Sequence, residues 1–264
     1  MKQNSVFIFR NAEGKKQKLQ ILYKDADLLV LNKPAGLRVV PDRWNEDLLN
    51  VYDLFNRDPA SSAEESEQKI WIVHRIDAGT SGLLICARNA ESHRILNQFF
   101  AEGAIQKTYL AVIKGCPSAA EGKIDLPLLV TSQGKVKVSS QGKNALTLYR
   151  VSERFRNFSL LEVFPKTGRM HQIRAHLQAI GHPLAVDPQY GGADSFKISD
   201  LKRMPFHEEV EESSLISRLT LHAWKLKVNH PVQQQAMEFE AGLPKDFSAL
   251  LKSLRKWDRI KING

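Results

Sequence analysis

The chain has 264 residues, of which 42% are hydrophobic, so it can bury a substantial core in one or two domains. Lysine and arginine outnumber aspartate and glutamate by 38 to 29, and the resulting net charge of +9 favours a polyanionic partner. No apolar run approaches the roughly 20 residues that cross a bilayer, and the N-terminus lacks the apolar core of a secretion signal. These features exclude a helical membrane protein and favour a globular, cytoplasmic one.

The only two cysteines, Cys86 and Cys116, lie in apolar surroundings without the spacing of metal ligands. We therefore expect buried thiols rather than a disulfide or a metal site. The sequence also contains no cofactor-binding motif. Any chemistry must then come from ordinary side chains, with no metal and no cofactor.

The first half of the chain predicts two short strands, a surface loop and a helix. The strands fall between Ile21 and Gly36 and are separated by the turn-forming residues 24–27. Residues 56–69 are polar without any apolar period, which is typical of a surface loop. Asn89 is a good cap for a helix that ends at Gly103. The apolar face of this helix consists of Ile95, Leu96, Phe99 and Phe100.

The second half predicts mainly strands. Strand-like patterns recur at residues 107–113, 145–151, 158–164, 219–228 and 236–240. Together with the helices, they predict an α+β fold around a mixed, mostly antiparallel sheet.

Two further helices are expected in this half. One runs from about residue 170 to residue 180, with His171, Arg174 and Gln178 on one face and Ile173 and Leu177 on another. The C-terminal segment carries an apolar stripe and an opposite basic side. The stripe consists of Phe247, Leu250, Leu251, Leu254 and Trp257, and the basic side of Lys252, Arg255, Lys256 and Arg259.

Residues 74–82 read His-Arg-Ile-Asp-Ala-Gly-Thr-Ser-Gly and lie between the apolar residues 71–73 and the strand-like residues 83–86. A loop in this place projects the carboxylate of Asp77 from a sheet. Judged from the residues alone, an aspartate among arginine, hydroxyl residues and glycine is more often part of a structural turn or a surface ion pair. The spacing by itself does not identify a catalytic group.

These residues resemble the signature of the RluA family of pseudouridine synthases, whose catalytic loop has the form HRLD followed shortly by TSGLL. Here the loop reads HRIDAGTSGLL. A second family block is matched by residues 166–177, 181–183 and 187–191. Softer matches occur at residues 31–36, 107–111, 221–223 and 230–231. Two long blocks in the family's order argue against chance agreement.

The resemblance extends from Ile21 to Phe247, with some departures. Ala78 and Gly79 replace a charged pair that is common in the family, and Met170 stands where a small hydroxyl residue is usual. Many members carry an extra N-terminal RNA-binding domain of the S4 type, whereas only about twenty residues precede the first matched block here. We therefore expect a catalytic domain over residues 21–264, without an S4 domain, after a short N-terminal extension over residues 1–20.

The resemblance implies roles for three residues in the reaction. Asp77 would be the essential nucleophile or electrostatic stabiliser, and Arg174 the cation that keeps it charged and oriented. Tyr109 would stack on the uracil and help to remove its C5 proton. Without the resemblance, Arg174 could equally contact a phosphate, and Tyr109 could be a core tyrosine on a strand.

The partner implied by the resemblance is RNA, either rRNA or tRNA, bound by a monomer. Arg75 would help to hold the RNA open so that the target base can leave its helix, although an isolated arginine is usually a surface residue. Lys33, Arg169 and His171 are candidates for the site wall or for phosphate contacts, with structural duty as the alternative. Residues 131–150 contain cations but no acidic residue, so they can follow an RNA backbone or form a solvated basic surface. The cations are Lys135, Lys137, Lys143 and Arg150.

Other functional classes fit the sequence less well. A glycosidase ordinarily needs a second positioned carboxylate, and none is evident beside Asp77. Residues 79–82 lack the spacing of a serine hydrolase, and His171 and His176 lack that of a zinc helix. A non-catalytic RNA-binding or RNA-folding factor on the same fold is the remaining alternative.

Overall fold

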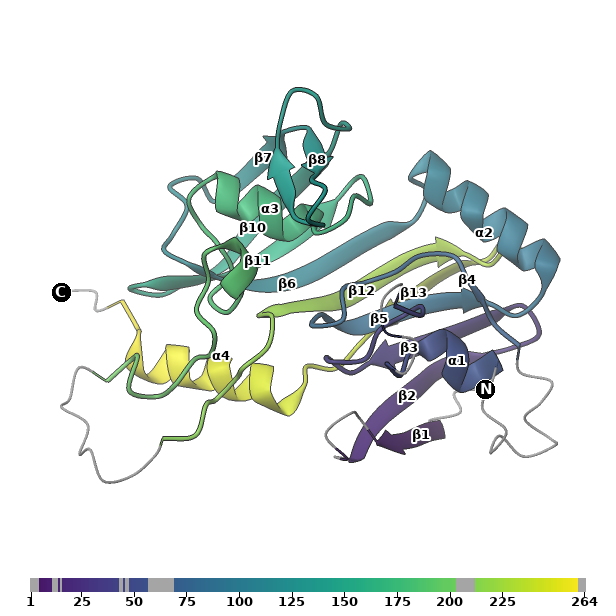
Figure 1. The fold of residues 1–264 in the computed structure, drawn as a ribbon, viewed down its shortest axis with the longest axis horizontal. Helices are drawn as coiled ribbons and strands as arrows, with labels where there is room; N and C mark the ends of the chain where they lie inside the picture. Colours follow the sequence, from purple (N-terminus) through teal and green to yellow (C-terminus); the bar gives the residue numbers. More distant parts are fainter. Residues whose placement is uncertain are drawn as a thin grey trace. The chain divides into compact units, whose positions relative to one another are not determined.

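The computed structural model describes residues 5–10, 14, 16–42, 45, 48–56, 69–202 and 212–260. The chain forms two compact units, each built from two separate stretches (Figure 1). Unit 1 comprises Met1–Lys107 and Ala223–Gly242, and unit 2 comprises Thr108–His222 and Leu243–Gly264. The predicted α+β fold is confirmed in both.

Unit 1 contains a sheet whose strand order is β1-β2-β3-β5-β12. In addition, β4 pairs with β5, and β13 pairs with β12. The pairings β1–β2, β2–β3, β3–β5, β4–β5 and β12–β13 are antiparallel. The strands are β1 (Ser5–Arg10), β2 (Lys16–Lys24), β3 (Leu28–Lys33), β4 (Trp71–Ile72), β5 (Ser81–Ala87), β12 (Leu221–Asn229) and β13 (Ala236–Glu240).

The central strand β5 carries the core of unit 1. Every residue of β5 is buried, as expected for an apolar strand that is covered on both faces. The helix α2 (Ala90–Glu102) packs against β4 and β5 (Figure 1). The side chain of Asn89 accepts the backbone N–H of Ser92, and Gly103 ends the helix in the left-handed conformation, so the predicted caps are confirmed.

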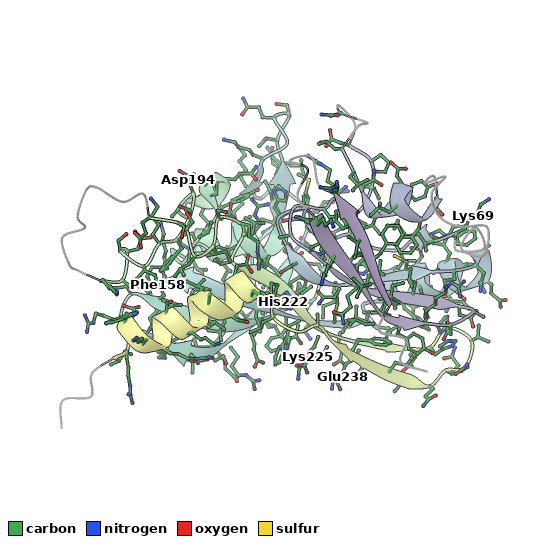
Figure 2. All side chains as sticks on the ribbon, turned by 90° about the horizontal axis from the view of Figure 1, so that it is seen from below. Lys69, Phe158, Asp194, His222, Lys225 and Glu238 are labelled. Carbon is green, nitrogen blue, oxygen red and sulfur yellow. The ribbon has the colours of Figure 1, made fainter. Side chains whose placement is uncertain are left out.

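The hairpin of β12 and β13 is lined with charged residues (Figure 2). Lys225 pairs with Glu240 at 3.3 Å, and Lys227 pairs with Glu238 at 3.1 Å. Pairs of this exposure contribute only ~0–1 kcal/mol each, so they set the solubility of this surface more than its stability.

Unit 2 contains a sheet with the order β6-β11-β10-β7, in which neighbouring strands are antiparallel. The helix α3 (Gln172–Ala179) packs against β10 and β11 and against a separate two-stranded sheet of β8 and β9. Ile173 and Leu177 of α3 lie in the core with strand residues, as the helical spacing predicts. The strands are β6 (Gln106–Lys114), β7 (Glu121–Asp125), β8 (Leu128–Val130), β9 (Val136–Val138), β10 (Leu146–Arg154) and β11 (Phe158–Pro165).

The remaining helices are α1 (Val51–Asn56), the short 3-10 helix η1 (Pro188–Tyr190) and α4 (Lys245–Trp257). The apolar stripe of α4 is buried as predicted, except at Trp257, which is 41% exposed. Trp257 therefore belongs to the apolar stripe of the sequence but not to the buried core.

Most strands expected from the sequence are present in the structure. The strands predicted around Ile21 to Gly36 and in the second half are confirmed, whereas β1, β7, β8 and β9 were not predicted. The residues set apart as an extension include β1 and the first part of β2, which are paired in the sheet. Cys86 is a buried free thiol, and burial raises its pKa to about 12, while Cys116 is only partly buried. Most of the polar segment 56–69 lies outside the described residues.

Candidate active site

Asp77 lies in the loop that joins β4 to β5, and its side chain is partly buried. Its carbonyl accepts the N–H of Thr80 at 3.0 Å, which closes a tight backbone turn over residues 77–80. At the start of β5, Gly82 has a φ of 109°, and a Cβ there would lie 2.1 Å from the carbonyl oxygen of Ala223 on β12. Only glycine can bring these backbones so close, and this contact fixes the end of the loop.

Lys33 holds the other side of this loop from the end of β3. Its side chain is fully buried, and its ammonium group donates to the carbonyls of Pro34, Leu37 and Ala78 at 2.9, 2.7 and 3.1 Å. The Ala78 carbonyl also accepts the N–H of Gly36 at 2.8 Å. The residue after Asp77 is thus tied to the segment after β3. These contacts support the structural role that the sequence left open for Lys33, because the ammonium group lies inside the protein.

His74 supports the loop before Asp77. Its Nε2 accepts the backbone N–H of Ile85 on β5 at 3.0 Å, and its ring stacks on Phe100 with the centroids 4.7 Å apart. Burial, with a smaller contribution from the charge of Lys107, lowers the pKa of His74 to about 3. The ring is therefore neutral at physiological pH and acts as an acceptor. This duty was not predicted, although the motif contains the residue.

In unit 2, the start of α3 is fastened by Gln172, which is buried. Its Oε1 accepts from the Thr167 hydroxyl at 2.7 Å and from the Arg169 backbone N–H at 3.0 Å. Its Nε2 donates to the Leu146 carbonyl and the Thr147 hydroxyl of β10 at 3.0 and 2.9 Å. The loop that precedes the helix is thus fixed to the sheet of unit 2.

Arg174 lies on α3 and is almost fully buried. Its Nε and Nη2 bind the two carboxylate oxygens of Asp187 at 2.7 and 2.9 Å, and Nη2 also donates to Gln189 at 2.9 Å. The guanidinium lies 4.8 Å from the centroid of the Tyr190 ring. Such a two-point pair fixes both the position and the plane of the guanidinium. Asp187 was quoted only as part of a motif, and its place beside Arg174 was not predicted; the pairing of Arg174 with Asp77 stays a prediction.

Tyr190 connects three parts of unit 2. Its hydroxyl accepts the backbone N–H of Val136 on β9 at 3.0 Å and is hydrogen-bonded to Nδ1 of His171 at 2.9 Å. His171 itself has a φ of 51°, a left-handed backbone that costs a non-glycine residue of order 1 kcal/mol. Tyr190 therefore contacts the β8–β9 sheet, His171 and Arg174. The sequence did not reveal this arrangement.

The other predicted site residues fall into two groups by exposure. Arg75, Lys135, Lys137 and Arg169 are exposed, and Arg169 donates through Nε to the carbonyl of Asn144 at 3.1 Å. Tyr109 is partly buried on β6, opposite Val163, and packs against the core of unit 2.

The comparisons with known proteins decide the family. The model named RNA pseudouridylate synthase matches residues 27–179, more than half of the chain and including Asp77, Tyr109 and Arg174. The chain belongs to this family. It is similar to ribosomal large subunit pseudouridine synthase D of Zymomonas mobilis, with 36% identity over 242 residues, which cover 89% of this chain and 73% of the relative. It is also 35% identical over 242 residues to ribosomal large subunit pseudouridine synthase C of Haemophilus influenzae, covering 90% and 69% of the two chains.

A solved structure supports the pseudouridine synthase fold. Human RNA pseudouridylate synthase domain containing 4 aligns with a TM-score of 0.71 at 24% identity, over 89% of this chain and 92% of that one. The family match and the named relatives identify the chain as an RNA pseudouridine synthase, an isomerase. Among the described residues, no helix is long and apolar enough to span a membrane.

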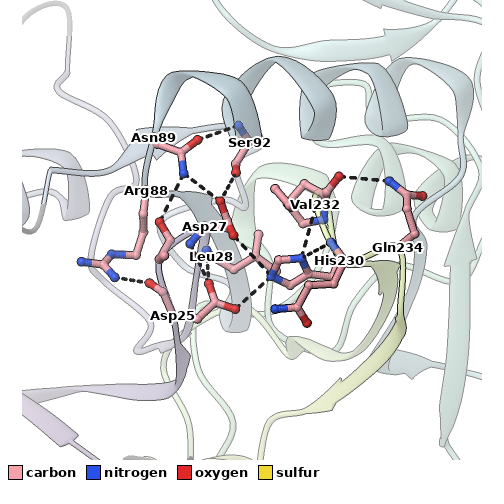
Figure 3. Close-up of polar contacts among 12 residues, drawn as sticks. Asp25, Asp27, Leu28, Arg88, Asn89, Ser92, His230, Val232 and Gln234 are labelled. Atoms are coloured by element: carbon pink, nitrogen blue, oxygen red, sulfur yellow. Dashed lines mark hydrogen bonds and ion pairs between the residues drawn. The ribbon is translucent and has the colours of Figure 1, made fainter.

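One cluster in this pseudouridine synthase has the spacing of metal ligands. Ligand atoms of Asp25, Asp27 and His230 lie within 4.8 Å of one another (Figure 3). However, Nδ1 of His230 accepts the backbone N–H groups of Val232 and Gln233 at 3.2 and 3.0 Å, so the ring proton is on Nε2. That proton points at Asp25 Oδ2, 2.9 Å away. A metal at Nε2 would have to displace it, so the donor set fits a metal poorly.

The hydrogen bonds around Asp25 instead make the cluster a tie within unit 1. Asp25 Oδ1 accepts the N–H groups of Asp27 and Leu28 at 2.7 and 2.6 Å, and Oδ2 accepts the Tyr23 hydroxyl at 2.5 Å. Asp27 in turn accepts from Asn89 at the start of α2. Burial alone would raise the pKa of Asp25, but the hydrogen bonds from Tyr23 and the other donors hold it below its usual value.

Proposed function

We propose that this enzyme converts specific uridines of ribosomal or transfer RNA into pseudouridine, that it does so in the cytoplasm, and that the reaction depends on Asp77. The observation that carries the proposal is the support of the Asp77 loop. Lys33 ties down the residue after Asp77, and His74 ties the residues before it to β5. A loop held in this way presents the Asp77 carboxylate from a fixed backbone, as a preorganised catalytic group requires. The names of the relatives, which refer to the large ribosomal subunit, support rRNA as the substrate.

The reaction requires no redox partner. The bond between N1 of uracil and C1′ of the ribose breaks, the base turns over, and a bond between C5 and C1′ forms. C5 then loses its proton, and N1 gains one, so atoms and electrons balance. In our proposal, the ionised carboxylate of Asp77 assists the first step, as the nucleophile on C1′ or as the negative charge beside it.

Arg174 and Tyr109 are proposed as partners of Asp77 in this reaction. The buried guanidinium of Arg174 is held in one plane by Asp187, so it can offer a fixed positive charge to the aspartate. Tyr109 would stack on the uracil and assist removal of the C5 proton through its hydroxyl. Both assignments rest on the family motif.

The RNA itself is proposed to contact the exposed cations named above. Arg75 lies two residues before Asp77 in the same loop and would hold the RNA open. Lys135, Lys137 and Arg169 would contact phosphates. His171, held by Tyr190, would line the site wall.

The experiment that identifies the substrate is a map of pseudouridines in rRNA and tRNA from cells with and without this enzyme. The proposal predicts that defined sites lose their pseudouridine and that the wild-type gene restores them. A gene carrying Asp77→Asn should not restore them. Unchanged maps in both RNA classes would contradict the proposed substrates, and restoration by Asp77→Asn would indicate a different catalytic residue.

A further inference from the structure

The C-terminal end of α4 exposes a large aromatic side chain. Trp257 is 41% exposed, whereas Phe247, Leu250, Leu251 and Leu254 of the same helix are buried. Trp257 follows Leu254 by three residues, so the helical period would place it close to the buried side. An indole that remains exposed here has no role in the core that the described residues form.

Two lysines lie close to this indole. The Nζ atoms of Lys202 and Lys256 each lie 4.7 Å from the centroid of the Trp257 ring, within the range of a cation–π contact. They come from different parts of the chain, because Lys202 precedes Lys256 by 54 positions. An exposed aromatic ring with two cations close to it is therefore assembled by the fold of unit 2 rather than by the helix alone.

The end of α4 is fastened to the turn between β10 and β11, which fixes the position of the indole. The carboxylate of Asp258 accepts the backbone N–H and the side-chain amide of Asn157, both at 2.8 Å. The carbonyl of Asp258 accepts the N–H of Arg156 at 2.7 Å. Arg255 adds a two-point pair with Glu153 on β10, at 2.8 and 2.5 Å. A ligand would thus bind a preformed surface, and binding would cost little conformational entropy of the protein.

Among the described residues near this indole, three carboxylates are already hydrogen-bonded or paired. Glu153 is paired with Arg255, Asp258 accepts from Asn157, and Asp200 accepts the backbone N–H of Lys197. Besides the two lysines near the ring, exposed cations are present at Arg156 and Arg259, which are next in the chain to the hydrogen-bonded Asn157 and Asp258. We call these cations, with Trp257, the Trp257 surface.

We propose that the Trp257 surface is an RNA-docking site that contains none of the residues of the candidate active site. An unpaired base stacks on the indole, and the lysines contact the phosphates that flank it. Stacking on an exposed aromatic ring combined with cations is how proteins hold single-stranded nucleic acid. An acidic protein would satisfy the charges but would leave the indole without a planar partner. The inference rests on the enzyme's action on RNA and not on the role of Asp77.

The test measures binding of the full-length enzyme to protein-free rRNA fragments that contain a modified uridine and its flanking loops. Trp257→Ala should weaken binding about tenfold, since the variant loses the aromatic ring on which the base stacks, whereas Trp257→Phe keeps a ring and should stay within about twofold. The matched control is Trp224→Ala. Trp224 also carries a lysine, Lys225 at 4.1 Å, but its indole N–H is bonded to Glu240. This control should bind like the wild type.

A second pair of variants tests the cations. Lys202→Gln combined with Lys256→Gln should reduce the log–log salt slope of binding by roughly 1.5, and Lys225→Gln with Lys227→Gln should leave it unchanged. Thermal unfolding confirms that each variant is folded. Because the readout is binding, its outcome is independent of whether Asp77 carries catalysis. Equal RNA affinity of Trp257→Ala and wild type would overturn the proposal. An effect seen only with protein-containing ribosomal particles would overturn it in favour of a protein partner.

Discussion

The ammonium group of Lys33 donates a hydrogen bond to the carbonyl of Ala78, 3.1 Å away and 45 positions further along the chain. This bond ties the residue that follows Asp77 to the end of β3. The candidate active site of this pseudouridine synthase therefore depends on a lysine that solvent does not reach.

Replacing this lysine should damage both stability and turnover. Lys33→Met fills the same space but removes the ammonium donor from three carbonyls, of which Ala78 keeps the N–H of Gly36, and this should cost about 1–3 kcal/mol of unfolding free energy. The loosened loop should lower kcat by more than tenfold with little change in KM, because the ammonium group is buried away from the RNA. Urea unfolding and steady-state kinetics measure these effects. Lys18→Met, at an exposed position of β2, is the control. A Lys33→Met enzyme with normal kcat would show that the loop needs no such tie.

His74 should make stability depend on pH. Its pKa is lowered to about 3 in the folded protein, against about 6.5 when unfolded, so the fold favours the neutral ring. The contribution is complete above pH 6.5 and is lost as the pH falls toward 3, with a slope of up to about 1.4 kcal/mol per pH unit. Urea unfolding of wild type and His74→Gln between pH 4 and 7 should show a shallower slope for the variant, which keeps an acceptor for Ile85. Identical slopes would mean that His74 is not held neutral.

The hydrogen bonds around Asp25 should contribute less to stability at high pH and at low pH than at neutral pH. The hydrogen bond to Asp25, with burial and the charges of Asp25 and Asp27, raises the pKa of Tyr23 to about 12, so its contribution is lost as the pH rises from 10 toward 12. The pKa of Asp25 is lowered, so its contribution is present at neutral pH and is lost as the pH falls below about 3.8. Tyr23→Phe should therefore flatten the alkaline limb of stability, and Asp25→Asn the acid limb. If neither substitution changed its limb, the tie would not contribute to folding.

The sequence predicts those elements whose signals are local. The caps at Asn89 and Gly103 mark α2 because each acts within one turn of the helix. The motif likewise marked the Asp77 loop. It did not reveal the burial of Lys33 or the partnership of Arg174 with Asp187, because each depends on a fold that brings separate segments together. The exposure of Trp257 was not predicted for a related reason. The helical period indicates which face of α4 is apolar, but not at which residue the rest of the protein stops covering that face.

The kcat of the enzyme should depend on the shape of the cation at position 174 as well as on its charge. Arg174→Lys keeps the charge but cannot reproduce the two-point pair with Asp187. We expect at least a tenfold loss of kcat, and a larger loss for Arg174→Ala. Asp187→Asn should reproduce part of the defect if the carboxylate positions the guanidinium. Full activity of Arg174→Lys would assign Arg174 a purely electrostatic role.

Turnover should persist in EDTA and should need no added cofactor, since the reaction is redox-neutral and the Asp25 cluster is hydrogen-bonded as a tie. RNA binding should weaken with monovalent salt, by a log–log slope of roughly −0.7 for each phosphate contacted on a single strand. Activity and affinity measured over a salt series in EDTA test both points. Recovery of lost activity by a divalent ion, with RNA folding unaffected, would contradict the metal-free mechanism.

The most direct test of the central claim is single-turnover formation of pseudouridine by Asp77→Asn on a mapped substrate RNA, with enzyme in excess. The matched control is Asp125→Asn, the same chemical change at an exposed position of β7. The amide preserves the shape of the side chain and removes its charge. We therefore expect no detectable product from Asp77→Asn, RNA affinity within a few-fold of wild type, and wild-type turnover from the control. Pseudouridine formed by Asp77→Asn at a rate near that of the wild type would contradict it.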